Sequence, residues 1–137
     1  MLDFDINCNK KLFDIDIENG DIKPCFDIKT AILMSIFCEK RADASQVKQI
    51  DIRRGHFSNQ FNDDYEVGSF YWLYSEQQKV SEANKEDLQD TILEGLQWLI
   101  DDNYLIDIDC NIDIIENKYI INITTTNIFN EEQNYTF

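Results

Sequence analysis

The sequence predicts a small α+β protein in which a small antiparallel sheet, formed by an N-terminal hairpin and a C-terminal hairpin, packs on two main helices. Between positions 88 and 100 apolar residues recur at helical spacing and form one stripe. The stripe consists of Leu88, Ile92, Leu96 and Leu99. From Leu105 to Ile115 apolar and polar residues alternate strictly, as in a half-buried strand. A helix followed directly by a strand is therefore the strongest structural prediction.

The main helix has two candidate starts. Ser75 with Gln78 matches a capping box, and Ser81 is a second candidate N-cap, so a separate helical turn is also possible before the helix. The aromatic segment 69–74 is compatible with a short strand or with the first turn of a helix. We expect the main helix to end near residues 101–103.

The C-terminal hairpin is predicted from alternation on both sides of a turn at 116–118. The buried face of its first strand is expected to carry Ile106, Ile108, Cys110, Ile112 and Ile114. The buried face of its second strand is expected to carry Tyr119, Ile121, Ile123 and Thr125. A polar C-terminal tail is expected at about 127–137.

The N-terminal part predicts strands and a second main helix. Alternation over 2–8 favours a short strand, and alternation over 13–17 before Asn19-Gly20 predicts a hairpin that returns at 21–23. Pro24 marks the end of the return strand or an edge position. Asp27 is the expected cap of the helix.

That helix is apolar on nearly all sides over 30–38, so we expect it to be buried, with Lys40 and Arg41 near its C-terminal end. A long irregular loop is predicted at about 42–68. A loop of this length is usually functional or ordered by a partner.

Composition limits the function classes. At 137 residues and 43% hydrophobic content, the chain is expected to form one domain, 1–137. The net charge of −15, from 27 acidic and 12 basic residues, argues against nonspecific binding to nucleic acid or anionic membrane and favours partners with basic surfaces. The charge is either neutralised in part within an assembly or forms a solvated surface.

Targeting signals and cysteine spacing indicate a cytosolic protein. The first five residues are acidic where a secretory signal is basic, and no apolar run approaches the roughly 18 residues of a membrane span. The cysteines have no C-x-x-C spacing and are expected to be reduced; they are Cys8, Cys25, Cys38 and Cys110.

The search for catalytic chemistry gives no strong candidate. A zinc site or a nucleophilic pair would have to use His56, the only histidine, and no residue near it has ligand spacing. An EF-hand at 14–25 fails because Gly20 stands at the seventh loop position and Cys25 at the twelfth. The acids of 107–113 predict the solvent face of a strand. We expect no enzymatic activity, no metal and no cofactor.

Four segments of the chain form a recognisable series: TAILMSIF at 30–37 with KRA at 40–42, DIRRG at 51–55, GS at 68–69 with WL at 72–73, and LQWLIDD at 96–102. In their order and spacing they resemble the baseplate wedge proteins of contractile-tailed phages. The family is the phage Mu-type late-protein family, similar to the T4-type wedge and sheath-initiating subunit and the P2 W protein. The chain departs from its pattern at His56-Phe57, where aromatics are usual, and at Phe70-Tyr71, where a basic or aliphatic residue is usual.

The resemblance implies a structural subunit of a contractile phage tail, or of a tail-like particle, that joins the wedge to the tube base and helps to initiate the sheath. The implied partners are the large baseplate wedge subunit, the tail sheath and the tail tube or hub proteins, with multiple copies in a symmetric assembly. The implied location is the host cytoplasm during assembly and then the virion baseplate.

Candidate interface residues follow from the cationic segment, the aromatics and the C-terminal hairpin. They are Arg53, Arg54, Gly55, His56, Phe57, Trp72, Ile121 and Ile123. The two arginines either pair with carboxylates of another subunit or fix the long loop to their own domain. The edge of the C-terminal hairpin is a candidate for strand addition.

Two other function classes stay open. An acidic DNA mimic that binds a basic host protein suits the charge, but it requires carboxylates spaced like phosphates on an exposed helix, whereas many acids here alternate on strands. A small hydrolase is the third hypothesis, although no particular pair of carboxylates is marked for it.

Overall fold

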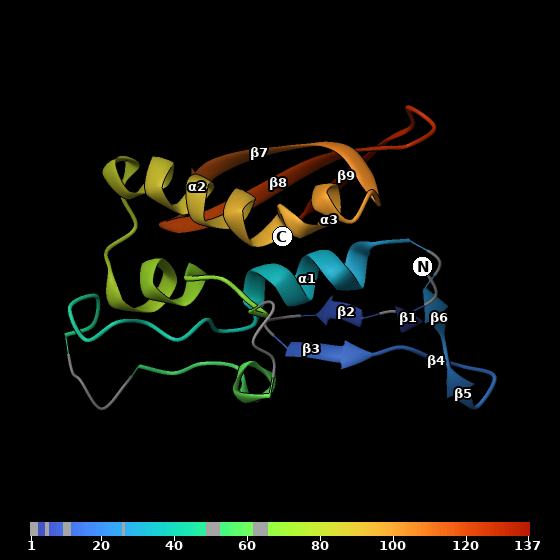
Figure 1. Ribbon diagram of the computed structural model, residues 1–137, viewed down its shortest axis with the longest axis horizontal. Helices are drawn as coiled ribbons and strands as arrows, with labels where there is room; N and C mark the ends of the chain where they lie inside the picture. Colours follow the sequence, from blue (N-terminus) through green and yellow to red (C-terminus); the bar gives the residue numbers. More distant parts are fainter. Residues whose placement is uncertain (1–2, 5, 10–11, 26, 49–52, 62–65) are drawn as a thin grey trace. The chain divides into compact units, whose positions relative to one another are not determined.

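The computed structural model divides the chain into two compact units (Figure 1). The N-terminal unit comprises Met1–Met34 and the C-terminal unit comprises Ser35–Phe137. The described residues are 3–4, 6–9, 12–25, 27–48, 53–61 and 66–137. Helices and antiparallel strands occur together, which confirms the predicted α+β class. The single-domain organisation stays a prediction.

The N-terminal unit contains short antiparallel strand pairs. They are β1 (Asp3–Phe4) with β6 (Pro24–Cys25), β2 (Ile6–Asn9) with β3 (Leu12–Ile15), and β4 (Ile17–Glu18) with β5 (Asp21–Ile22). The predicted turn is confirmed, because Asn19 and Gly20 have the positive φ angles, 54° and 83°, of a type I′ turn. The first strand of the predicted hairpin is shorter than predicted, because β3 pairs with β2 and only β4 pairs with β5. Leu2, in the first predicted strand, lies outside the described residues.

Helix α1 comprises Lys29–Phe37. Asp27 caps it as predicted, since its Oδ1 accepts a hydrogen bond from Lys29 N at 2.8 Å. Most of its apolar side chains are buried, but Met34 is 40% exposed, so the helix is not buried on every side. Lys40 and Arg41 follow its end without entering its last turn.

The main helix consists of α2 (Lys85–Leu96) and α3 (Trp98–Asp101). Of the two predicted starts, Ser81 is the observed one. Its Oγ accepts a hydrogen bond from Asn84 N at 3.4 Å and caps the 3₁₀ helix η3 (Glu82–Asn84), which leads into α2. The predicted apolar stripe is confirmed, because all of its members are 0% exposed: Leu88, Ile92, Leu96 and Leu99.

The C-terminal unit also contains a three-stranded antiparallel sheet. Its order is β7 (Leu105–Ile115), β8 (Lys118–Asn127) and β9 (Glu132–Thr136). Helices α2 and α3 pack against β7 (Figure 1). The predicted face of β8 is buried as expected: Tyr119, Ile121, Ile123 and Thr125. This sheet is separate from the N-terminal hairpin β4–β5.

Two predictions for the sheet require correction. The expected polar tail contains a third strand, which is joined to β8 by side-chain hydrogen bonds such as Thr124 Oγ1 to Asn134 Oδ1 at 2.8 Å. A register shift between Leu105 and Asp107 marks a bulge. As a result Leu105 is buried, whereas Ile106, predicted to face the core, is 51% exposed.

The segment before the main helix is helical. Leu73–Gln77 form the π-helix η2, and Ser75, the other candidate cap, lies inside it. The predicted loop at 42–68 contains a short 3₁₀ helix, η1 (Phe57–Gln60), and its residues 49–52 and 62–65 lie outside the described residues.

Candidate functional site

The candidate site begins where the segment after α1 runs beside the segment before η2. Ser69 N donates to Cys38 O, and Lys40 N donates to Ser69 O, both at 3.0 Å. The buried Ser69 Oγ donates to Ile36 O at 2.6 Å. Gly68 has φ 99°, and a Cβ there would lie 2.3 Å from Cys38 O. A side chain at this position therefore requires the backbone to move.

Arg53 is joined to Ala42 by backbone and side-chain hydrogen bonds. Ala42 N donates to Arg53 O at 3.0 Å, and Arg53 Nε donates to Ala42 O at 2.6 Å. Asp43 lies 3.8 Å from Arg53 Nη2, but its side chain is 83% exposed, so this ion pair contributes little. Ala42 is fully buried in a cluster with Val47, Trp72 and Leu73. Arg53 thus holds the returning loop against a buried residue.

Arg54 connects several elements of the C-terminal unit. Its Nη1 and Nη2 each lie 2.5 Å from a carboxylate oxygen, of Glu39 and Glu76 respectively. Its Cζ lies 4.8 Å from the centre of the Trp72 ring, in a cation–π contact. The hydrogen bond to Glu76 raises the pKa of the Arg54 guanidinium above its ordinary value. We call these four residues the Arg54 cluster.

The backbone turns sharply at Arg54 and Gly55, which have φ angles of 50° and 125°. Arg41 Nη1 donates to Arg54 O at 3.2 Å and holds the outside of this turn. A Cβ on Gly55 would lie 3.0 Å from Arg41 Cβ. A positive φ is readily adopted by glycine, as at position 55, but strains a residue with a side chain, as at Arg54.

His56 and Phe57 follow the turn and start η1. His56 Nδ1 lies 2.6 Å from Ser58 Oγ and accepts from Ser58 N at 3.4 Å, so its ring acts as the helix cap. The His56 and Phe57 rings are tilted, with centroids 4.8 Å apart. Phe57 is 70% exposed and Phe61 is 82% exposed. The loop therefore displays two aromatic side chains to solvent.

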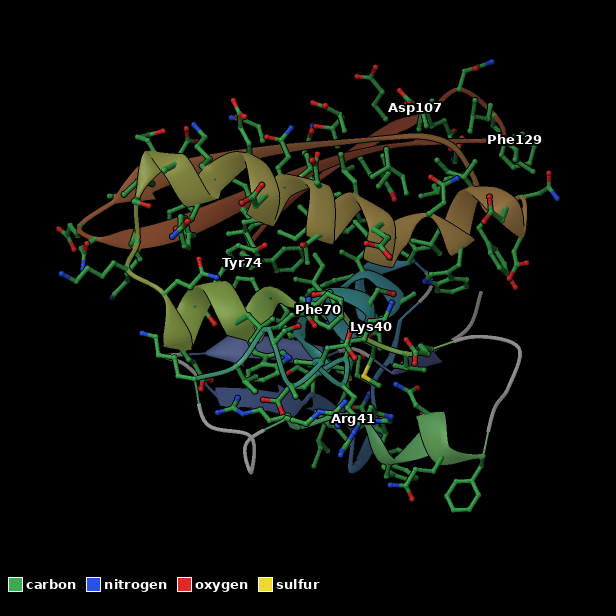
Figure 2. All side chains as sticks on the ribbon, turned by 60° about the vertical axis from the view of Figure 1, so that its left-hand side comes forward. Lys40, Arg41, Phe70, Tyr74, Asp107 and Phe129 are labelled. Carbon is green, nitrogen blue, oxygen red and sulfur yellow. The ribbon has the colours of Figure 1, made fainter. Side chains whose placement is uncertain are left out.

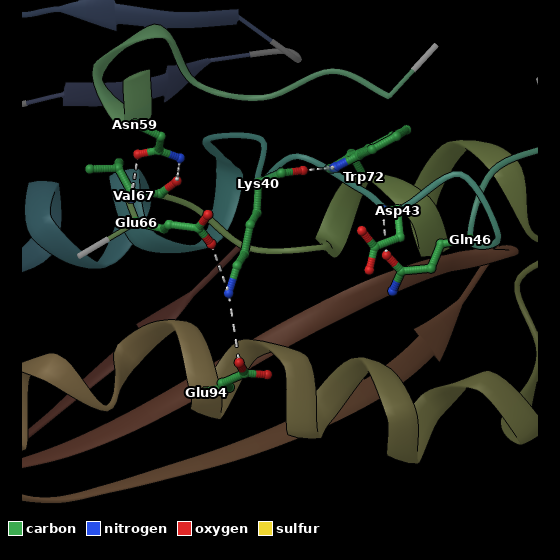
Figure 3. Close-up of polar contacts among 8 residues, drawn as sticks. All are labelled: Lys40, Asp43, Gln46, Asn59, Glu66, Val67, Trp72 and Glu94. Atoms are coloured by element: carbon green, nitrogen blue, oxygen red, sulfur yellow. Dashed lines mark hydrogen bonds and ion pairs between the residues drawn. The ribbon is translucent and has the colours of Figure 1, made fainter. Parts of the chain in front are cut away.

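Lys40 and Asn59 tie the loop to its surroundings (Figure 3). Lys40 Nζ lies 3.3 Å from Glu66 Oε2, 3.7 Å from Glu94 Oε1 and 5.3 Å from the centre of the Phe70 ring; Figure 2 labels Lys40 and Phe70. Asn59 Nδ2 donates to Val67 O at 3.1 Å, and Val67 N donates to Asn59 Oδ1 at 2.8 Å. The Asn59 amide thus imitates a backbone pair and closes the loop.

Three of the predicted interface residues are buried. Trp72 is 3% exposed and donates from Nε1 to Lys40 O at 3.0 Å (Figure 3). Ile121 and Ile123 are 1% and 0% exposed because they lie on the buried face of β8. They are therefore not exposed on the surface of this chain, whereas Phe57 is.

The described part of the chain has no group of three or more His, Cys, Asp or Glu side chains placed to hold a metal ion. None of its helices is long and apolar enough to cross a membrane. The arrangement of the arginines is that of a loop fastened by hydrogen bonds, ion pairs and one cation–π contact. The structure therefore defines a small α+β protein in which Arg53 and Arg54 join a loop to neighbouring segments.

The comparisons with known proteins identify the family. The model of the family described as phage protein GP46 matches residues 28–132, which include the Arg54 cluster and most of the C-terminal unit. The chain therefore belongs to the phage protein GP46 family, and it is a phage protein. No curated protein and no solved structure matches it.

Sequence reasoning did not identify the partners of the arginines. Glu39 and Glu76 are two of 27 acidic residues and carry no local signal. Arg41 and Asn59 are also ordinary in sequence, although both hold the loop. Only pairings between residues far apart in the chain distinguish them, and alternation or helical spacing does not encode such pairings.

Proposed function

We propose that this phage protein is a structural subunit of a contractile tail baseplate, which joins the wedge to the tube base and helps to initiate the sheath. The observation that carries the proposal is the meeting of three segments of the wedge-protein resemblance. Ala42 pairs with Arg53, Arg54 stacks on Trp72, and Lys40 pairs with Ser69. Residues distant in sequence that resemble the wedge family thus form one structural feature.

The geometry supports a role in binding other proteins. The described residues after Arg53 and Arg54 display Phe57 and Phe61, and exposed aromatic side chains are common anchors in protein interfaces. Strands β7 and β9 are the outer strands of their sheet, so strand addition would occur at one of them and not at β8.

The same contacts favour a local role for Arg54. Its guanidinium group forms ion pairs with Glu39 and Glu76 of its own chain, so pairing with another subunit would break existing ion pairs. We propose that Arg53 and Arg54 fix the loop, and that the loop's exposed aromatics make the contact. In this proposal the protein has no catalytic activity and requires no cofactor.

Co-expression with the large wedge subunit of the same phage, followed by size-exclusion chromatography with light scattering, tests the proposal. We expect a stable stoichiometric complex for the wild type. A double variant, Phe57→Ser with Phe61→Ser, should weaken the complex, and Ile115→Ser, which changes another exposed side chain at 56% exposure, is the matched control. A wild-type chain that stays free at low and high salt contradicts the proposal. Stable binding to a basic nucleic-acid-binding host protein instead would favour the DNA-mimic alternative.

A further inference from the structure

Exposed apolar side chains gather at one end of the three-stranded sheet. Tyr104, Ile106, Ile128 and Phe129 are 43%, 51%, 56% and 75% exposed. Leu105 pairs with Asn127, so the start of β7 lies beside the turn between β8 and β9. Figure 2 shows Asp107 and Phe129 at this same end. We call the four apolar residues the tip patch.

The turn that carries half of the tip patch is held by one side chain. Asn127 Oδ1 accepts hydrogen bonds from Phe129 N at 2.8 Å and Glu131 N at 3.0 Å. Asn127 Nδ2 donates to Glu131 Oε2 at 2.8 Å. Ile128 and Phe129 therefore project from an ordered turn, so a partner need not order it on binding.

The other half of the patch is also held in place. Asn103, with φ 60°, ends α3 in a Schellman arrangement in which Tyr104 N donates to Leu99 O at 2.9 Å. The Tyr104 ring meets Trp98 edge to face at 5.9 Å, and Trp98 Nε1 donates to Ser35 Oγ at 2.9 Å. The bulge turns Ile106 outward. Exposed apolar side chains grouped in this way are a common feature of protein interaction sites.

The charged side chains that the described residues of the sheet and the end of α3 place beside the patch are acidic. The exposed acidic residues at this end are Asp101, Asp102, Asp107, Glu131 and Glu132. Between 101 and 137 the sequence has a single basic residue, Lys118, which begins β8 at the opposite end of the sheet. A second copy of this chain, with net charge −15, or an anionic membrane would be repelled.

We propose that the tip patch is a docking surface for a protein partner that has an apolar pocket bordered by lysine and arginine. Phe129 and Ile128 fill the pocket, Tyr104 and Ile106 cover its border, and the surrounding carboxylates pair with the basic residues. This inference goes beyond the baseplate role and does not depend on it, because it rests only on residues of the sheet and α3.

Site-specific photo-cross-linking tests this inference in cells that express the phage tail genes. p-Benzoylphenylalanine replaces Phe129 in one variant and Ile115, at the far end of β7, in the control. We expect position 129 to cross-link to one protein, through a segment rich in lysine and arginine, and position 115 to give only background. The yield at 129 should fall roughly fivefold with Ile128→Ser, and again between about 0.1 and about 0.5 M salt.

Quantitative binding completes the test. With the identified partner purified, Phe129→Ser should raise the Kd by about 30-fold or more, while Ile115→Ser, at the opposite end of β7, should leave it within about twofold. The inference is overturned if position 129 cross-links to a second copy, to the same proteins as position 115, or to nothing. A basic partner outside the baseplate would support the tip patch and contradict the proposed baseplate role.

Discussion

Gly68→Ala is expected to be a severe glycine substitution in the C-terminal unit. Its φ of 99° costs an L-residue about 1–2 kcal/mol. The new Cβ would also lie 2.3 Å from Cys38 O, and a backbone carbonyl cannot rotate away as a side chain can. Relieving such a contact typically costs a further 1–3 kcal/mol or so. The free energy of unfolding should therefore fall by roughly 2–5 kcal/mol.

Gly55→Ala is the matched control. It also has positive φ, 125°, but its nearest obstacle is Arg41 Cβ at 3.0 Å, so the loss should stay near 1–2 kcal/mol or slightly above it. Urea denaturation followed by the fluorescence of Trp72 and Trp98 measures both values. For a chain of this length the extra loss at Gly68 corresponds to a fall in Tm of roughly 3–12 °C. Equal losses at the two glycines would refute the steric argument.

Three further predictions concern single side chains. In a double-mutant cycle of Arg54→Met with Glu76→Gln, the coupling energy should be about 1 kcal/mol, because the carboxylate is half-exposed; zero coupling would mean that this pair does not hold the loop. Burial raises the pKa of the Cys110 thiol to about 12, so the folded state keeps its proton after the unfolded state has lost it. The contribution of Cys110 to the free energy of unfolding is complete below pH 8.5 or so, and it falls by about 1.4 kcal/mol per pH unit as the pH rises toward 12. In urea titrations at alkaline pH, Cys110→Ala should therefore lose less of its free energy of unfolding than the wild type. Asn127→Ala should speed amide hydrogen exchange at Phe129 by about fivefold, since a net hydrogen bond contributes about 1 kcal/mol, and unchanged exchange would contradict the ordered turn.

The parts of the fold predicted from sequence are those fixed by burial. Leu88 belongs to an apolar repeat with the helical period, and Ile112 belongs to one with the strand period of two. Each repeat indicates which side of its element faces the core. This is why the main helix and both strands of the C-terminal hairpin are found at the expected places. The capping roles of Asp27 and Ser81 are also predicted from the sequence, because each is a hydrogen bond between residues close together in the chain.

The remaining features depend on contacts without periodicity. Strand β9 has mostly exposed polar side chains, so no apolar repeat distinguishes it from a tail. The bulge at Ile106 breaks an alternation that the sequence continues without interruption. Ile121 and Ile123 lie on the predicted buried face of β8, and their place in an interface stays a prediction. The pairing of β9 with β8, which makes β8 the central strand, is not predicted from the sequence.

The cationic segment illustrates how far a candidate site can be predicted. Its unusual charge in an acidic chain identifies Arg53 and Arg54 as important, and in the structure Arg53 bonds to Ala42 while Arg54 lies over the Trp72 ring. The sequence does not indicate that Arg53 bonds to Ala42 and Arg54 to Glu39 of the same chain, because these partners are distant in sequence and meet only in the folded protein.

The pairing of β9 makes stability uneven across the sheet. At one end Phe137 exchanges backbone hydrogen bonds with Ile121, both at 2.9 Å, and its ring meets Phe37 at 5.9 Å. At the other end Asn127 orders the turn, while between these anchors Gln133 and Asn134 are exposed. Strand β9 pairs with β8 along its length, but most of its side chains are exposed and add little burial to that pairing. We therefore expect the amides of β9 to exchange with solvent before those of β7 and β8.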